Sequence, residues 1–119
     1  YTRNDIKMNV YDTANKLAGE IKTSEEYNNF KIAKETINLN QDLKNKIHEF
    51  NQKRYEVQLN AMQTGKNDEE KFKKVQEMYI ELIENPDAKK YFEAETKFNI
   101  LIADVNKIIG ESIQDVMKD

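Results

Sequence analysis

The chain has 119 residues, of which 34% are charged and 38% are hydrophobic, and this size suits a single domain, residues 1–119, with a modest core. The absence of cysteine excludes a disulfide framework and a thiolate-held zinc or iron–sulfur centre. The net charge of −3 gives no overall attraction to nucleic acid or to an anionic lipid surface. No apolar run approaches about 20 residues, and the first residues lack the pattern of a secretory signal. We therefore expect a cytoplasmic protein without a membrane segment.

One proline and three glycines are too few turn residues for a many-stranded fold, so we expect an all-α fold of about five helices. In residues 5–22 the apolar side chains recur every three or four positions, which predicts the first helix. Thr23 or Ser24 is the expected cap of a second helix. That helix should end at the asparagine-rich break of residues 38–40.

The third helix is predicted over residues 41–64, with Gly65 as a left-handed C-cap. Asn67 or Asp68 should cap the fourth helix. Pro86 suits the first turn of the last helix, which we expect to run towards Lys118. Gly110 lowers its local helix propensity by up to about 1 kcal/mol, which leaves open a kink or break at that residue.

The third and fifth helices should be about 36 and up to about 48 Å long at 1.5 Å per residue. A compact chain of this size has a radius of gyration of only about 13.5 Å. The long helices should therefore extend beyond a compact body while still carrying apolar side chains, namely Val57, Leu59, Ala61 and Met62 on one and Ile108, Ile109, Ile113, Val116 and Met117 on the other. Because soluble monomers avoid large exposed apolar patches, we expect the two long helices to pack as an antiparallel bundle in a homodimer or higher oligomer.

Catalytic chemistry has little support in the sequence. His48 is the only histidine, so neither a two-histidine zinc site nor a Ser/His/Asp triad is indicated. An all-α metal-dependent nucleotide phosphohydrolase is an alternative, and it requires four acids to converge: Glu81, Glu84, Glu111 and Asp115. Otherwise we expect no catalytic residue, no metal ligand and no cofactor.

Nucleic-acid binding is a further alternative. The lysine pairs at residues 73–74 and 89–90 are its best candidates, but acids surround both pairs. Neither neighbourhood interleaves aromatic residues with arginines, as a platform for base stacking would. Direct binding of nucleic acid is therefore not expected.

Several stretches of the sequence carry a family resemblance. They are NVYDTANKL at residues 9–17, SEEY at 24–27, the spacing Phe50-x-x-x-Arg54-x-x-x-Gln58 followed by Gln63-x-Gly65, and AETKFNILIADVNKII at 94–109. Together they resemble the YlbF/YmcA family of small bacterial helical proteins, most closely its YheA-like branch. The resemblance covers nearly the whole chain from Asn9 onwards.

The resemblance implies an all-α fold, oligomerisation through long helices and a non-enzymatic role in the cytoplasm of Gram-positive-type bacteria. Some relatives are accessory factors for an endoribonuclease that matures messenger RNA, and they affect competence, sporulation and biofilm formation. Relatives that hold iron–sulfur clusters use cysteines, which this chain lacks. YheA-like members often have proline after the Ile-Ile pair, where this sequence has Gly110-Glu111.

We therefore expect a self-associating helical regulator or adaptor that presents a groove or a helix face to a protein partner. The expected contact residues lie on the two long helices: Phe50, Arg54, Val57, Phe98, Ile102 and Val105. Arg54 falls on the apolar stripe of its helix, where two interpretations stay open. It either pairs across an interface or extends from the edge of the core to solvent.

Overall fold

The computed structural model describes residues 9–118, which form six helices and no strand. The all-α prediction is therefore confirmed. The helices are α1 (Val10–Lys22), α2 (Glu25–Asn38), α3 (Gln41–Thr64), α4 (Glu69–Leu82), α5 (Pro86–Ser112) and α6 (Gln114–Met117). None of the described helices is long and apolar enough to span a membrane.

Side-chain caps define where the main helices begin. Ser24, Asn40 and Asp68 each accept a hydrogen bond from the backbone amide three residues later, as expected at an N-cap. Asn85 caps α5, with Pro86 in the first turn. Gly65 ends α3 at φ 73°, the left-handed conformation that a glycine C-cap supplies. The predicted boundaries of α3 and the predicted break at residues 38–40 are confirmed.

The first and last helices differ from the predicted ranges. Residues 5–8 lie outside the described residues, and the described helix begins at Val10 with Asn9 as its cap. The last helix passes through Gly110 and ends at Ser112 instead of running to Lys118. The Ser112 hydroxyl donates to the Ile109 carbonyl at 2.7 Å. The Ile113 amide donates to the Gly110 carbonyl, three residues earlier, instead of to the Ile109 carbonyl that would continue the α-helix. The four-residue helix α6 follows this break.

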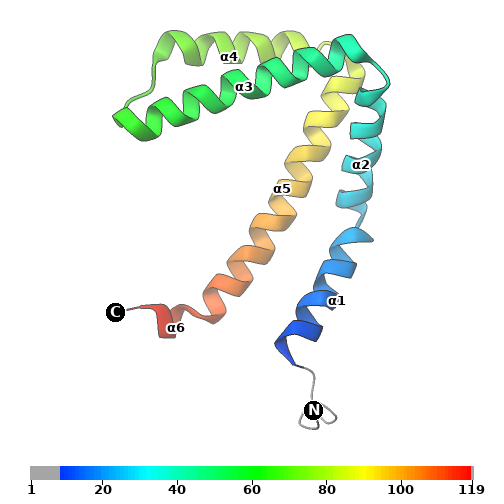
Figure 1. Ribbon diagram of the computed structural model, residues 1–119, viewed down its shortest axis with the longest axis vertical. Helices are drawn as coiled ribbons and strands as arrows, with labels where there is room; N and C mark the ends of the chain where they lie inside the picture. Colours follow the sequence, from blue (N-terminus) through cyan, green and yellow to red (C-terminus); the bar gives the residue numbers. More distant parts are fainter. Residues whose placement is uncertain (1–8, 119) are drawn as a thin grey trace.

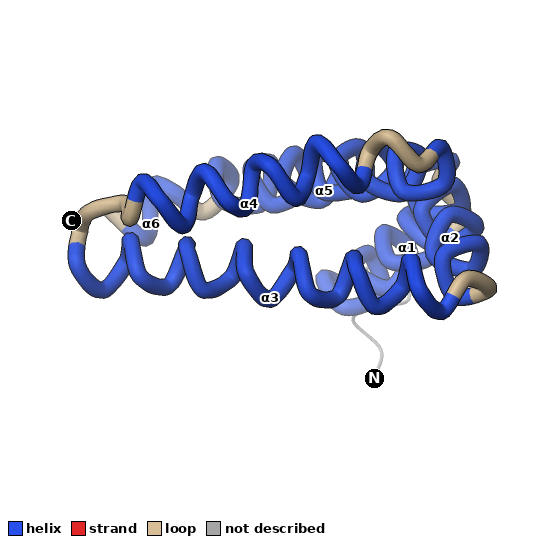
Figure 2. Tube along the Cα trace, turned by 90° about the horizontal axis from the view of Figure 1, so that it is seen from above, coloured by secondary structure: helices blue, strands red, loops and turns tan. Residues whose placement is uncertain are grey.

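Two helical arms meet at an elbow (Figure 1). In one arm α3 and α4 lie side by side as a hairpin, and both views show them paired along their length (Figures 1 and 2). In the other arm α5 packs against α2, with α1 continuing beyond α2. Within one chain the two long helices therefore diverge, and each pairs with a shorter helix. The expected packing of α3 against α5 along their length does not occur in one chain.

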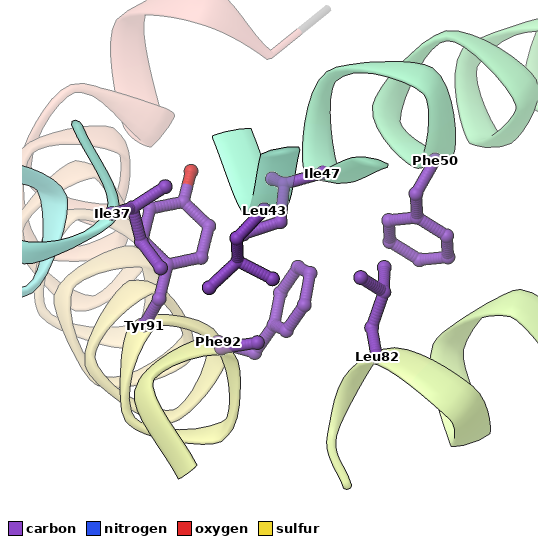
Figure 3. Packing of buried hydrophobic residues seen from close by; sticks show 8 residues of the cluster. Ile37, Leu43, Ile47, Phe50, Leu82, Tyr91 and Phe92 are labelled. Atoms are coloured by element: carbon purple, nitrogen blue, oxygen red, sulfur yellow. The ribbon is translucent and has the colours of Figure 1, made fainter. Parts of the chain in front are cut away.

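The core lies at the elbow, where four helices converge (Figure 3). Its buried apolar residues are Ile37 from α2, Leu43, Ile47 and Phe50 from α3, Leu82 from α4, and Ala88, Tyr91 and Phe92 from α5. The Phe92 ring contacts the rings of Phe50, Tyr79 and Tyr91 at centroid distances of 5.2 to 5.4 Å. This small cluster fixes the two arms to each other, and the arms extend from it into solvent.

The molecule is much more extended than a compact chain of the same length. Its radius of gyration is 19.4 Å and its extents are 58 × 40 × 19 Å, against about 13.5 Å for a compact domain of this length. Apolar side chains at the ends of the arms are exposed, including Met62 on α3 and Ile108 on α5, the latter 68% exposed. The predicted extension of the long helices beyond a compact body is present in the structure.

Two glycines offer a matched test of the backbone. Gly65→Ala should lower the free energy of unfolding by about 1 kcal/mol, because a Cβ is disfavoured at positive φ. Gly110→Ala should instead raise it, by up to about 1 kcal/mol, since Gly110 is helical and an added Cβ meets no atom within 4 Å. Urea unfolding followed by circular dichroism measures both changes. A stabilising Gly65→Ala would contradict the left-handed cap.

Candidate interaction surfaces

A polar cluster joins the two arms beside the core. The Arg54 guanidinium on α3 lies 3.8 Å from the Glu95 carboxylate on α5 and donates a hydrogen bond of 2.9 Å to the Asn51 side chain. Its Cζ atom is 5.3 Å from the centre of the Phe50 ring. Of the two interpretations left open for Arg54, the structure thus shows an arginine at the edge of the core, paired within its own chain.

Tyr91 places a hydroxyl in the same cluster. This hydroxyl donates to Glu95 at 3.5 Å. Burial raises the pKa of Tyr91 above its ordinary value of 10.0, and the neighbouring Glu95 charge adds to the rise, while Arg54 opposes it. Tyr91 therefore stays neutral near pH 7 and donates only a long hydrogen bond to Glu95.

The Arg54–Glu95 pair should contribute modestly to stability. A double-mutant cycle with Arg54→Ala and Glu95→Ala should give a coupling free energy of about 0.2–1 kcal/mol, because the pair is long at 3.8 Å and partly exposed to water. The exposed Asp42–Lys46 pair on α3 is the matched control, with an expected coupling of about 0.5 kcal/mol or less. A coupling above about 2 kcal/mol for Arg54–Glu95 would show that the cluster is desolvated and structurally dominant.

Three of the expected contact residues share one face of α5. Phe98 packs against the rings of Tyr27 and Phe30 of α2. Ile102 and Val105 follow it at helical spacing, so they continue the same face towards the end of α5. Along this part of the arm α5 and α1 diverge (Figure 1), and both side chains remain partly exposed. Phe98, Ile102 and Val105, together with the exposed Ile109, are called the distal α5 face below.

The other expected contact residues lie elsewhere. Phe50 is 3% exposed and belongs to the core, so a partner of the single chain would not touch it. Val57 belongs to α3 in the other arm. With Val75 and Met78 of α4 it lines a small hollow between the two helices. The six residues therefore do not form one patch. The structure groups Phe98, Ile102 and Val105, and separately groups Phe50 with Arg54.

A groove between α2 and α5, the α2/α5 groove, was not expected from the sequence. It has a volume of about 710 Å³. Its apolar lining comprises Ile32 and Ala33 of α2 and Ala94, Ile100 and Leu101 of α5. The signal in the sequence is the pair Ile32 and Ile100, which are apolar yet lie off the main apolar stripe of their helices.

The acids that a metal-dependent phosphohydrolase would need do not converge in one chain. Glu81 and Glu84 lie next to the start of α5, whereas Glu111 is in its last turn and Asp115 in α6. The length of α5, about 40 Å for 27 residues, separates the two pairs (Figure 1). Within residues 9–118 no group of three or more acidic, histidine or cysteine side chains is arranged to hold a metal ion.

Comparison with known sequences identifies relatives along nearly the whole chain. The sequence profile of the family described as "Control of competence regulator ComK, YlbF/YmcA" matches residues 10–114. A UPF0342 protein of Desulfitobacterium hafniense is 37% identical over 110 residues, which cover 92% of this chain and 89% of the relative. A UPF0342 protein of Caldicellulosiruptor bescii is 36% identical over 106 residues, 89% of each chain.

A more distant relative extends the range of organisms. The UPF0342 protein of Lacticaseibacillus casei is 32% identical over 108 residues, which cover 91% of this chain and 95% of the relative. No solved structure matches the chain significantly. The matched residues include both arms and the elbow between them.

Proposed function

The chain belongs to the YlbF/YmcA family, and from this premise we propose that it is a non-enzymatic regulatory protein of the cytoplasm, which self-associates through its long helices and binds other proteins. The family's description concerns control of a competence regulator. An all-helical regulatory protein is consistent with that description. Self-association and partner binding are the finer parts of the proposal.

The observation that carries the proposal is the exposed apolar surface at the end of the α5 arm. Ile108, Ile109, Ile113, Val116 and Met117 are all exposed, Val116 to 86%. Among the described helices, α2 and α6 make the main contacts with α5, and α2 lies towards the other end of α5 (Figure 1). Because a contiguous apolar surface in water favours association, a second copy that covers it would remove it from solvent.

The distal α5 face is the proposed centre of this contact. Because Phe98 packs on Tyr27 and Phe30 of α2, the same face further along α5 is directed towards the side on which α1 continues beyond α2 (Figure 1), and we propose that a helix of a second chain packs there. The half-buried Leu17 and Ile21 of α1 would then be covered together with Ile102 and Val105. Such a contact would build the helical bundle that one chain does not complete by itself.

The process that the protein regulates is proposed to be messenger RNA maturation, through which competence, sporulation and biofilm formation are affected. The test is made in the native host with the gene deleted. Transcript ends are mapped in the deleted strain and after complementation with wild type, with Ile102→Glu/Val105→Glu, or with the control Ile80→Glu on the exposed side of α4.

We expect wild type and the control to restore the transcript ends, and the distal α5 variant to fail. Transcript ends that are unchanged by the deletion would contradict the link to messenger RNA maturation. Restoration by the distal α5 variant would contradict a functional role for self-association through this face.

A further inference from the structure

The α2/α5 groove has an exposed apolar floor. Ile32 is 61% exposed and Ile100 is 55% exposed, although both line the groove between two packed helices. Ala33 and Ala94, one from each helix, are the small residues between them. A helix laid along this floor would bury both isoleucines, and the small alanines would let it approach closely.

The rim of the groove is acidic. Five carboxylates line it, those of Glu25, Glu26, Asp87, Glu93 and Asp104, against two ammonium groups, those of Lys90 and Lys97. None of the five carboxylates lies within ion-pair distance of a cation in the part of the chain that the structure describes. The apolar floor is thus bordered by five carboxylates and two ammonium groups, an excess of three negative charges.

From the floor and the rim together we infer that the α2/α5 groove binds a basic amphipathic helix of a partner protein. The partner's apolar stripe would cover Ile32 and Ile100, and its lysines or arginines would face the rim carboxylates. This mode of recognition places an amphipathic helix in an apolar groove, with anchors at positions i, i+3, i+4 and i+7. Binding of such a helix rests on the partner binding in the proposed function.

The groove sets the length of the bound helix. Its lining residues run from Glu25 to Thr36 on α2 and from Asp87 to Asp104 on α5. At 1.5 Å per residue these stretches are about 17 and 26 Å long. A partner helix of about 12 to 18 residues would fill the groove.

A second copy of the chain fits the groove poorly. A two-fold contact through this surface would place the rim carboxylates of one copy against the same carboxylates of the other. Helix α4 carries three lysines, Lys71, Lys73 and Lys74, but also four glutamates, Glu69, Glu70, Glu77 and Glu81, so it is not a net basic helix. The groove also lies on the side of α5 opposite Glu95, as helical spacing places them, and apart from the distal α5 face.

The experiment uses two fluorescein-labelled synthetic peptides of about 18 residues with the same leucine stripe. One carries lysine at every polar position and the other carries glutamate. Fluorescence anisotropy measures their binding to the full chain at low and moderate salt. We expect the lysine peptide to bind, more weakly as salt rises, and the glutamate peptide not to bind.

Charge reversal locates the binding site. Glu93→Lys/Asp104→Lys on the rim should raise the dissociation constant of the lysine peptide at least about tenfold. The matched control Glu20→Lys/Glu77→Lys changes the net charge equally at exposed positions outside the groove, and should change the constant less than about twofold. Ile100→Ala removes apolar surface from the floor of the groove and should raise the dissociation constant of the lysine peptide about 3-fold or more.

In the binding measurements, any of three results would overturn the inference: no binding of the lysine peptide below about 1 mM, equal weakening by both charge-reversal variants, or equal binding of both peptides. Light scattering on the same samples separates this inference from self-association. A fall in oligomer mass for the rim variant alone would assign the groove to a second copy and overturn the inference. A monomeric wild type that still binds the lysine peptide at the rim would refute self-association and leave the groove supported.

Discussion

Phe92→Ala should lower the free energy of unfolding by about 3–5 kcal/mol, the usual cost of removing a buried phenylalanine ring. Phe92 is 4% exposed and packs against Phe50, Tyr79 and Tyr91 at the elbow. Domains of this kind are stable by only about 5–15 kcal/mol. The loss is large here because the same small cluster holds both arms, so the substitution weakens the contacts that join them.

Urea unfolding followed by circular dichroism measures this effect. Tyr55→Ala is the matched control, because Tyr55 is an exposed aromatic residue of α3, and its loss should cost less than about 0.5 kcal/mol. A cost below about 1 kcal/mol for Phe92→Ala would mean that the elbow is not the core that joins the arms.

Ile102→Glu/Val105→Glu should raise the dissociation constant for self-association at least about 100-fold. The physical reason is that a second copy would bury both new carboxylates without partners, and central contact residues commonly cost 2 kcal/mol or more each when altered. Sedimentation velocity over a range of concentrations measures the constant. We expect the variant to stay folded and to sediment as a single chain of 14.1 kDa.

Two further variants keep this prediction testable if the half-buried positions disturb the fold. Ile109→Glu changes an exposed residue of the same face and should weaken self-association without lowering the helix content. Ile80→Glu changes an exposed isoleucine on α4 and should leave the oligomer intact. An oligomer that survives both distal α5 variants would place the contact on another surface.

The helices could be predicted because their signals are local. Asn40, Asp68 and Gly65 act within a few residues of their own positions, and the caps appear where the sequence indicates them. The end of α5 could not be predicted from spacing. There the Ser112 hydroxyl donates to the Ile109 carbonyl, which the Ile113 amide would bond in a continued α-helix. The apolar stripe continues to Ile113 in the sequence, and this continuation led to the predicted single helix.

The arrangement of the arms depends on contacts between distant residues. Arg54 and Glu95 both fall within the stretches that resemble the family, yet nothing in the sequence pairs them, because they lie on different helices. The grouping of Phe98, Ile102 and Val105 followed from helical spacing alone. The α2/α5 groove could not be predicted, because Ile32 and Ile100 line the same groove only after α2 and α5 pack together.

Light scattering of the wild-type chain over a wide concentration range tests the central claim most directly. The claim is that the distal α5 face and the end of the arm are covered by a second copy. The account predicts a mass of at least twice 14.1 kDa. A mass of 14.1 kDa at every concentration, with the apolar arm ends still exposed to solvent, would contradict it.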